Sequence, residues 1–238
     1  MQKSTVEEIR ERFDADVERF SDLSAAQASA VDSSLCLDLL TEAASLTTPQ
    51  PTEVLDLGCG AGNYTLRLLP KLASPPAVIR LVDLSRPMLD RAVLRIREAG
   101  FGGEIVDLQG DIREVDLGHP DTVLAAAVLH HLRTPEEWEA MFGRLYLAMS
   151  PRSGLWIYDM VDSEIPAVQQ ILQQRYAQYL TALKDEEYCR HVFDYIQKED
   201  TPSPLSTQLN QLRRAGFSKV DGIHASSGFA AYGAGKGI

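Results

Sequence analysis

The fold is indicated by residues 54–63, which read Val54-Leu55-Asp56-Leu57-Gly58-Cys59-Gly60-Ala61-Gly62-Asn63. An apolar stretch typical of a buried strand runs into glycines at alternate positions, and a helical pattern follows. Glycine allows a tight turn and lets a ligand lie close to the main chain. The first amides of the following helix can bind polar groups of that ligand. The stretch therefore predicts a strand–loop–helix ligand site, with a glycine-rich turn that binds nothing as the alternative.

Two common phosphate-binding loops do not fit this stretch. The dinucleotide pattern GxGxxG needs a third glycine where the chain has Asn63. The P-loop needs Gly-Lys followed by Ser or Thr, which is absent after this strand. The loop alone therefore does not identify the ligand.

Short apolar runs alternate with helical stretches on either side of the loop. The runs that we expect as strands are 53–57, 77–82, 104–108, 122–129 and 155–158. The helices expected between them are 63–72, 86–99 and 136–149. This alternation predicts an α/β, Rossmann-like sheet that is mostly parallel and covered by helices on both faces.

The same patterns divide the chain into a cap, a core and a lid. Residues 1–50 are expected to form an N-terminal helical cap, with a second helix from about Ser24 to Ser45 and Ser24 as its cap residue. The core comprises 51–160 and 201–238, and it closes with a helix over 205–215 and strands over 217–225 and 229–235. Residues 161–200 are helical in pattern but too long for a simple crossover, so we expect a helical lid insertion.

Polar residues follow successive predicted strands. Asp83 lies 21 residues after Gly62, where a carboxylate can accept both hydroxyls of a ribose. Asp111 follows the third strand and could accept an amine of a base. His130 follows the fourth strand. Because the carboxyl ends of parallel strands meet at one edge, these side chains are expected in one crevice.

These motifs together resemble the class I S-adenosylmethionine-dependent methyltransferases. The residues that carry the resemblance are DLGCGAGN at 56–63, VDLSRPML at 82–89, GDI at 110–112 and VLHHL at 128–132. The resemblance implies a seven-stranded sheet whose last strand is antiparallel, and S-adenosylmethionine as the cofactor. It covers about 50–160 strongly and 205–238 moderately. The turn Pro151-Arg152-Ser153-Gly154 departs from the Pro-Gly-Gly that members often carry.

The resemblance also implies which residues bind the cofactor. The methionine end is assigned to Asp56 and the glycine loop, and the ribose to Asp83. Met88 is expected to pack on the adenine, Asp111 to accept its amine and Ile112 to flank the ring. The full predicted set is Asp56, Gly58, Cys59, Gly60, Gly62, Asn63, Asp83, Leu84, Met88, Asp111, Ile112 and Val128.

Candidate catalytic residues are His130, Asp159 and Tyr176. Methyl transfer from a sulfonium is an in-line displacement with a good leaving group, so a base is needed only for an O–H or N–H acceptor. His130 is therefore a candidate base, Asp159 a candidate for positioning substrate, and Tyr176 a candidate to stabilise the cationic methyl group. Structural roles are the alternative for each. No metal ligands are predicted, because Cys189 and His191 alone do not make a metal site.

Composition limits the partners. The net charge is −11, and the first 50 residues hold 10 acidic but 4 basic residues, which disfavours a general grip on nucleic acid or anionic membranes. The 3 cysteines are widely spaced, so a disulfide framework is excluded. No apolar run is long enough for a membrane span, and no signal peptide is evident, so we expect a cytoplasmic location.

Three functions remain open. The first is a methyltransferase that acts on a small molecule, as a monomer or homodimer. The second is a tRNA-modifying transferase that uses S-adenosylmethionine or a derivative, because the Phe13-Asp14 segment and the helical insertion resemble the branch containing the tRNA wobble-uridine carboxymethyl transferases. The third is a cofactor-binding protein without turnover.

Overall fold

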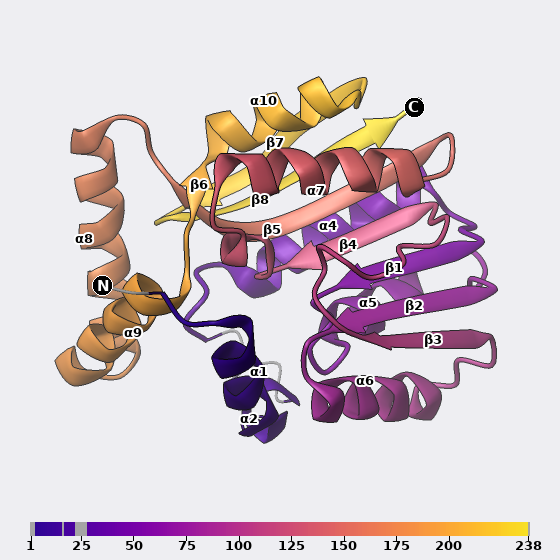
Figure 1. The fold of residues 1–238 in the computed structure, drawn as a ribbon, viewed down its shortest axis with the longest axis horizontal. Helices are drawn as coiled ribbons and strands as arrows, with labels where there is room; N and C mark the ends of the chain where they lie inside the picture. The colour runs from indigo at the N-terminus through magenta and orange to yellow at the C-terminus, as the bar shows by residue number, and fades with distance from the viewer. Residues whose placement is uncertain (1–2, 16, 22–27, 238) are drawn as a thin grey trace.

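The computed structural model describes residues 3–15, 17–21 and 28–237. Its sheet has the strand order β3-β2-β1-β4-β5-β8-β7, and β6 pairs with the end of β5 (Figure 1). The strands are β1 (Glu53–Leu57), β2 (Val78–Asp83), β3 (Glu104–Gln109), β4 (Thr122–Ala126), β5 (Ser153–Asp162), β6 (Ser203–Pro204), β7 (Lys219–Ser226) and β8 (Phe229–Lys236). β8 runs antiparallel to both β5 and β7, whereas the pairs among β1 to β5 are parallel. The predicted fold class is confirmed.

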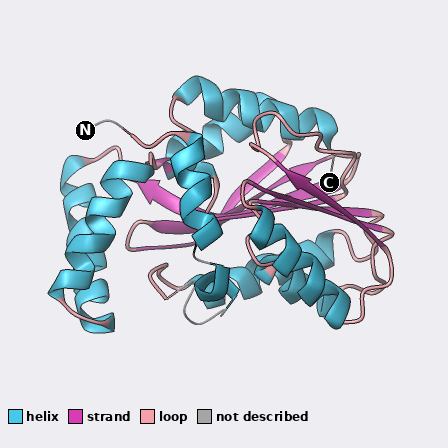
Figure 2. Cartoon of the chain, turned by 60° about the horizontal axis from the view of Figure 1, so that its bottom comes forward, coloured by secondary structure: helices cyan, strands magenta, loops and turns pink. Residues whose placement is uncertain are grey.

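Helices cover both faces of the sheet, as Figure 2 shows. They are α1 (Val6–Ala15), α2 (Val17–Ser21), α4 (Ser33–Thr47), α5 (Asn63–Leu68), η1 (Leu69–Lys71), α6 (Arg86–Glu98), η2 (Leu129–His131), α7 (Pro135–Ala148), α8 (Pro166–Leu183), α9 (Glu186–Glu199) and α10 (Leu205–Ala215). Among the described residues, no helix combines the length and the apolar composition that a bilayer span requires.

The period-two alternation of side chains along the strands divides the core between these faces. Leu55 and Leu57 of β1 pack with α7 and α10 in one cluster that includes Phe142 and Leu212. Val54, which precedes Leu55 in sequence, points to the opposite face and packs with α4 and α5. The central strands are therefore buried on both sides, which explains their continuous apolar composition.

Several predicted boundaries differ from the structure. The single helix predicted from about Ser24 to Ser45 is interrupted, because residues 28–32 form turns and α4 begins at Ser33; Ser24, the predicted cap residue, lies outside the described residues. The fourth strand ends at Ala126 instead of Leu129, because Ala127 takes a positive φ of 53° and the chain then forms the 3-10 turn η2. This turn re-aims the two histidines that follow the strand.

The fifth strand is longer than predicted. β5 extends to Asp162 because β8 pairs with it from Ser153 to Met160 and β6 pairs with Val161 and Asp162. After β5, α8 and α9 pack against each other and stand beside the sheet, while α1 and α2 lie against α6 (Figure 1). The division of the chain into cap, core and lid stays a prediction.

Candidate active site

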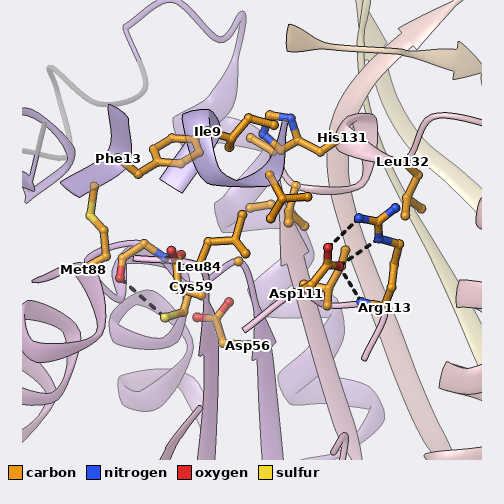
Figure 3. Close-up of a pocket in the computed structure, with 18 of the residues that line it drawn as sticks. Ile9, Phe13, Asp56, Cys59, Leu84, Met88, Asp111, Arg113, His131 and Leu132 are labelled. Atoms are coloured by element: carbon orange, nitrogen blue, oxygen red, sulfur yellow. Dashed lines mark hydrogen bonds and ion pairs between the residues drawn. The ribbon is translucent and has the colours of Figure 1, made fainter. Parts of the chain in front are cut away.

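A cavity of about 370 Å³ opens at the carboxyl ends of β1, β2 and β4. The glycine loop and the start of α6 form one side of it. The residues Val6, Ile9 and Phe13 of α1 also line it, and Figure 3 shows Ile9 and Phe13 across the space from Asp56 and Cys59. The volume lies in the range of small-molecule sites. Within the described chain, no residue of 161–200 lines the cavity, so its roof comes from α1.

The glycine loop has the backbone that its sequence predicted. Gly58, Gly60 and Gly62 have φ values of 61°, 50° and 80°, in the left-handed region that favours glycine. A Cβ on Gly58 would lie 2.4 Å from Cγ2 of Val128, whereas a Cβ on Gly60 would meet nothing within 4 Å. Gly60 therefore presents bare backbone to the cavity that it lines.

Two carboxylates, a buried one on Asp56 and a half-buried one on Asp83, hold the loop and the helix that follows it. Oδ2 of Asp83 accepts a hydrogen bond from the Gly60 amide at 2.8 Å, and Oδ1 accepts one from the Ser85 amide at 2.9 Å. Oδ2 of Asp56 accepts a hydrogen bond from the Thr65 hydroxyl at 2.6 Å. Burial raises the pKa of Asp56 to about 7 and that of Asp83 to about 6. Both carboxyls line the cavity and would gain from a cationic or hydroxyl-bearing ligand.

The residues predicted to hold the adenine also lie together. Met88, Leu84 and Ile112 line the cavity with Asp111. Arg113, which sequence reasoning missed, donates to both carboxylate oxygens of Asp111, at 3.0 Å from Nε and 2.6 Å from Nη2 (Figure 3). Burial would raise the pKa of Asp111, but these hydrogen bonds outweigh it and hold the pKa below its usual value.

The remaining predicted binding residues lie where the loop is supported. Asn63 lines the cavity, and its Oδ1 accepts a hydrogen bond from Arg95 at 2.7 Å. Arg95 also donates to the carbonyl of Ala61 at 2.6 Å, so it holds the loop from α6. The Cys59 thiol is buried and burial raises its pKa, which fits a packing role rather than a nucleophile.

None of the three predicted catalytic residues lines this cavity. His130 is buried behind it, with Nδ1 hydrogen-bonded to Asp159. Oδ2 of Asp159 accepts the amide of Leu129 at 2.7 Å, so this carboxylate is fully buried within β5 and positions the turn η2. Tyr176 lies in the core against Phe229, and its hydroxyl donates to the carbonyl of Ser29 at 2.9 Å. The geometry thus gives these residues structural and positioning roles.

His131, the neighbour of the predicted base His130, is the imidazole that lines the cavity. Its ring meets Phe13 edge-on at a centroid distance of 6.1 Å. Burial, together with the charges of His130 and Arg133, lowers its pKa well below the usual value, so the ring is neutral. Ile9 and Phe13 are four residues apart, which places them on one face of a helix and was the sequence signal for this roof. That spacing did not show which part of the protein the apolar face would cover.

Comparison with known proteins assigns the family. Residues 54–152 match a family model described as a methyltransferase domain, and this segment contains the glycine loop, Asp83, Asp111 and the two histidines. The chain carries a class I methyltransferase domain. Its cofactor is S-adenosylmethionine. The site fits this cofactor, because desolvated carboxylates face a cationic sulfonium compound favourably and bare backbone at Gly60 permits close approach.

The relatives of this methyltransferase are distant. The carboxy-S-adenosyl-L-methionine synthase of Shewanella sp. (strain W3-18-1) is 25% identical over 171 residues, which cover 70% of this chain and 69% of the relative. The structure of magnesium protoporphyrin IX methyltransferase from Synechocystis PCC 6803, with bound SAH, has a TM-score of 0.66 at 15% identity and covers 98% of this chain and 100% of that chain. An O-methyltransferase family protein from Burkholderia thailandensis has a TM-score of 0.66 at 17% identity, with 94% and 61% covered.

At these identities the solved structures show the fold alone. The methyltransferase chain spans 54–61% of the length of several of them, including the Burkholderia protein. The match to the methyltransferase domain nevertheless supports an S-adenosylmethionine-dependent enzyme.

Proposed function

We propose that this methyltransferase transfers the methyl group of S-adenosylmethionine to a small-molecule acceptor. The observation that carries the proposal is the roof of the cavity. Ile9 is 4% exposed and lines the same space as Asp83 and Gly60. An acceptor that reaches the cofactor must therefore fit beneath α1, which suits a small molecule better than a folded macromolecule.

The chain's own residues position and shield the reaction. In-line displacement at a sulfonium needs an aligned acceptor and exclusion of water more than it needs acid–base groups. The loop and Asp83 would hold the cofactor, and the apolar side chains of Ile9, Phe13 and Leu132 would exclude water from the acceptor side. The hydrogen bonds of Asp159 to the Val128 and Leu129 amides would keep that side rigid.

Binding of the cofactor is the first test. We expect calorimetry to show S-adenosylhomocysteine binding that Asp83→Ala weakens at least about tenfold, because the ribose loses a charged acceptor. Asp90→Ala, on the exposed side of α6, is the matched control and should bind as the wild type does. Unchanged affinity in Asp83→Ala would overturn the assignment of the site.

Substitutions in α1, the roof of the cavity, test the class of acceptor. Mass spectrometry of the ligand carried by the purified protein, followed by turnover assays with related compounds, should identify a small acceptor. Phe13→Ala should then raise the KM of that acceptor, while Glu11→Ala, on an exposed position of α1, should not. Turnover with total tRNA, and none across a broad small-molecule panel, would contradict the proposal.

One observation favours a second candidate, a transferase that handles a carboxylated derivative of the cofactor. Arg133 lines the cavity, and among the residues that the structure describes its guanidinium contacts the carbonyls of Glu199 and Ser4 and the Thr201 hydroxyl, with no carboxylate partner. A ligand carboxylate would give this cation a partner. The Shewanella relative, named for such a derivative, adds support.

Calorimetry separates the two candidates. The second candidate requires tighter binding of carboxy-S-adenosylmethionine than of S-adenosylmethionine, with the preference lost in Arg133→Met. Equal affinities would remove it. A mobility shift with total tRNA that weakens steeply with salt would extend this candidate to an RNA acceptor.

A further inference from the structure

Three buried ligand-type side chains meet between η2 and the end of α9. Oδ1 of Asp200 lies 3.6 Å from Nε2 of His130 and 3.5 Å from Nδ1 of His131. One atom from each residue lies within 4.8 Å of the other two. Ligand atoms bound at about 2.0–2.2 Å in a tetrahedron around zinc are about 3.3–3.6 Å apart. The two measured separations therefore match ligands that share one metal ion.

Two of these atoms have no hydrogen-bond partner in the described part of the chain. They are Nδ1 of His131 and Oδ1 of Asp200, and both are shielded from solvent. The separation of 3.5 Å between them is too long or too poorly aligned to count as a hydrogen bond. Burying such groups without partners is costly, so their convergence needs an occupant.

Asp159 orients the third ligand in the way that metal sites require. His130 uses Nδ1 for its hydrogen bond to Asp159, which leaves Nε2 directed toward Asp200. Metal-binding histidines commonly donate their other ring nitrogen to a carboxylate in this way. The amide of Thr201 donates to the carbonyl of His130 at 2.7 Å, so the two ligand-bearing segments are also fixed by main-chain contact.

The nearby cationic side chains make hydrogen bonds to main-chain carbonyls and, in the described part of the chain, none to the carboxylate of Asp200. Lys3 donates to the carbonyl of Asp200, and Arg133 donates to the carbonyl of Glu199. Oδ1 of the Asp200 carboxylate therefore keeps no hydrogen-bond partner among the described residues. A proton on His130, placed between Asp159 and Asp200, is the competing way to satisfy that ring, but it leaves Nδ1 of His131 without a partner.

We propose that His130, His131 and Asp200 bind one divalent transition-metal ion of the zinc class. Two imidazoles and one carboxylate favour such ions over magnesium or calcium, which prefer oxygen ligands. Of the three ligands, His131 is the one that lines the cavity. A metal ion with an open coordination position on that side would bind an oxygen of the acceptor and lower its pKa. This role depends on the proposed function, whereas metal binding does not.

The test uses the full chain, dialysed against a chelator and then titrated without any cofactor. We expect zinc to bind at one equivalent by calorimetry and to raise the Tm by mass action. Cobalt(II) should give the intense visible absorption of a four-coordinate ion. Asp200→Asn and His131→Gln preserve side-chain size, and each should weaken zinc binding at least about tenfold.

His119→Ala, which removes an exposed imidazole, is the matched control and should bind zinc as the wild type does. Thermal unfolding of the metal-free variants shows whether each one is folded. The proposal is overturned if the folded wild type binds no zinc at micromolar concentration, or if both ligand variants bind as tightly as His119→Ala. Zinc binding with no effect on methyl transfer would overturn only the catalytic role.

Discussion

Gly58 and Gly60 offer a test of the glycine loop in which two neighbouring alanine substitutions should differ. Both residues have positive φ, yet an alanine Cβ at 58 would lie 2.4 Å from Cγ2 of Val128, whereas at 60 it would meet nothing within 4 Å. Val128 follows β4 in a segment whose amide is held by Asp159. It therefore cannot move without disturbing that contact.

The expected losses follow from these contacts. A left-handed backbone costs a non-glycine residue about 1–2 kcal/mol, and overpacking a buried site costs about 1–3 kcal/mol more. Gly58→Ala should thus lower the free energy of unfolding by about 2–5 kcal/mol, and Gly60→Ala by about 1–2 kcal/mol. At about 2–4 °C per kcal/mol for a chain of this size, the Tm should fall by about 4–20 °C and about 2–8 °C.

Ligand binding should separate the variants again. Gly60→Ala adds a methyl group where the ligand approaches the backbone, so its affinity for S-adenosylhomocysteine should fall more than its stability does. Thermal unfolding and calorimetry measure the two effects. Gly143→Ala, within α7 and with open space at its Cβ, is the control: it should leave the affinity unchanged and raise the stability by about 1 kcal/mol, the gain of alanine over glycine in a helix. Equal stability losses at 58 and 60, or unchanged affinity in Gly60→Ala, would refute this account of the loop.

Three further predictions address individual side chains. Tyr176→Phe should cost about 0.5–1.5 kcal/mol of stability by urea unfolding, because the bond to Ser29 is lost, and a large fall in kcat would contradict its structural role. Asp159→Asn should loosen η2 and therefore lower kcat more than it raises the KM of the cofactor. Steady-state kinetics measures both, and a larger change in KM than in kcat would indicate that Asp159 holds the cofactor instead. Because burial raises the pKa of Asp83 to about 6, the folded state binds its proton more tightly than the unfolded state. The stability difference between wild type and Asp83→Asn should therefore shift against the wild type as the pH rises from about 4 to 6, and a pH-independent difference would refute the shift.

The fold could be predicted from local patterns because its central strands are buried on both faces. Residues 53–57 and 205–215 had the bounds that the sequence predicted. The predicted end of the fourth strand was wrong because an apolar run does not reveal a positive φ, which Ala127 adopts. The fifth strand was predicted to be shorter than it is, because its length depends on pairing with β8, which is distant in sequence.

The clustering of the predicted cofactor residues could be foreseen for a different reason. Asp56 lies near the end of β1, Asp83 ends β2 and Asp111 follows β3, so topology alone brings them together. The support given by Arg95 and Arg113 was missed, since ion pairs and carbonyl contacts depend on how α6 and the loop after β3 are oriented. Sequence adjacency equally could not distinguish His130 from His131.

The different positions of the His130 and His131 rings depend on η2. A strand would send adjacent side chains to opposite faces, whereas the 3-10 turn keeps the two rings together, with centroids 4.5 Å apart. Asp159 binds the inner ring and leaves the outer one at the cavity. Asp159, which was predicted from the sequence to position the substrate, thus lies behind His130 and acts through that imidazole, which it orients. A metal ion held by His130, His131 and Asp200 would contact both rings, whereas a proton on His130 would satisfy one ring and leave Nδ1 of His131 without a partner among the described residues.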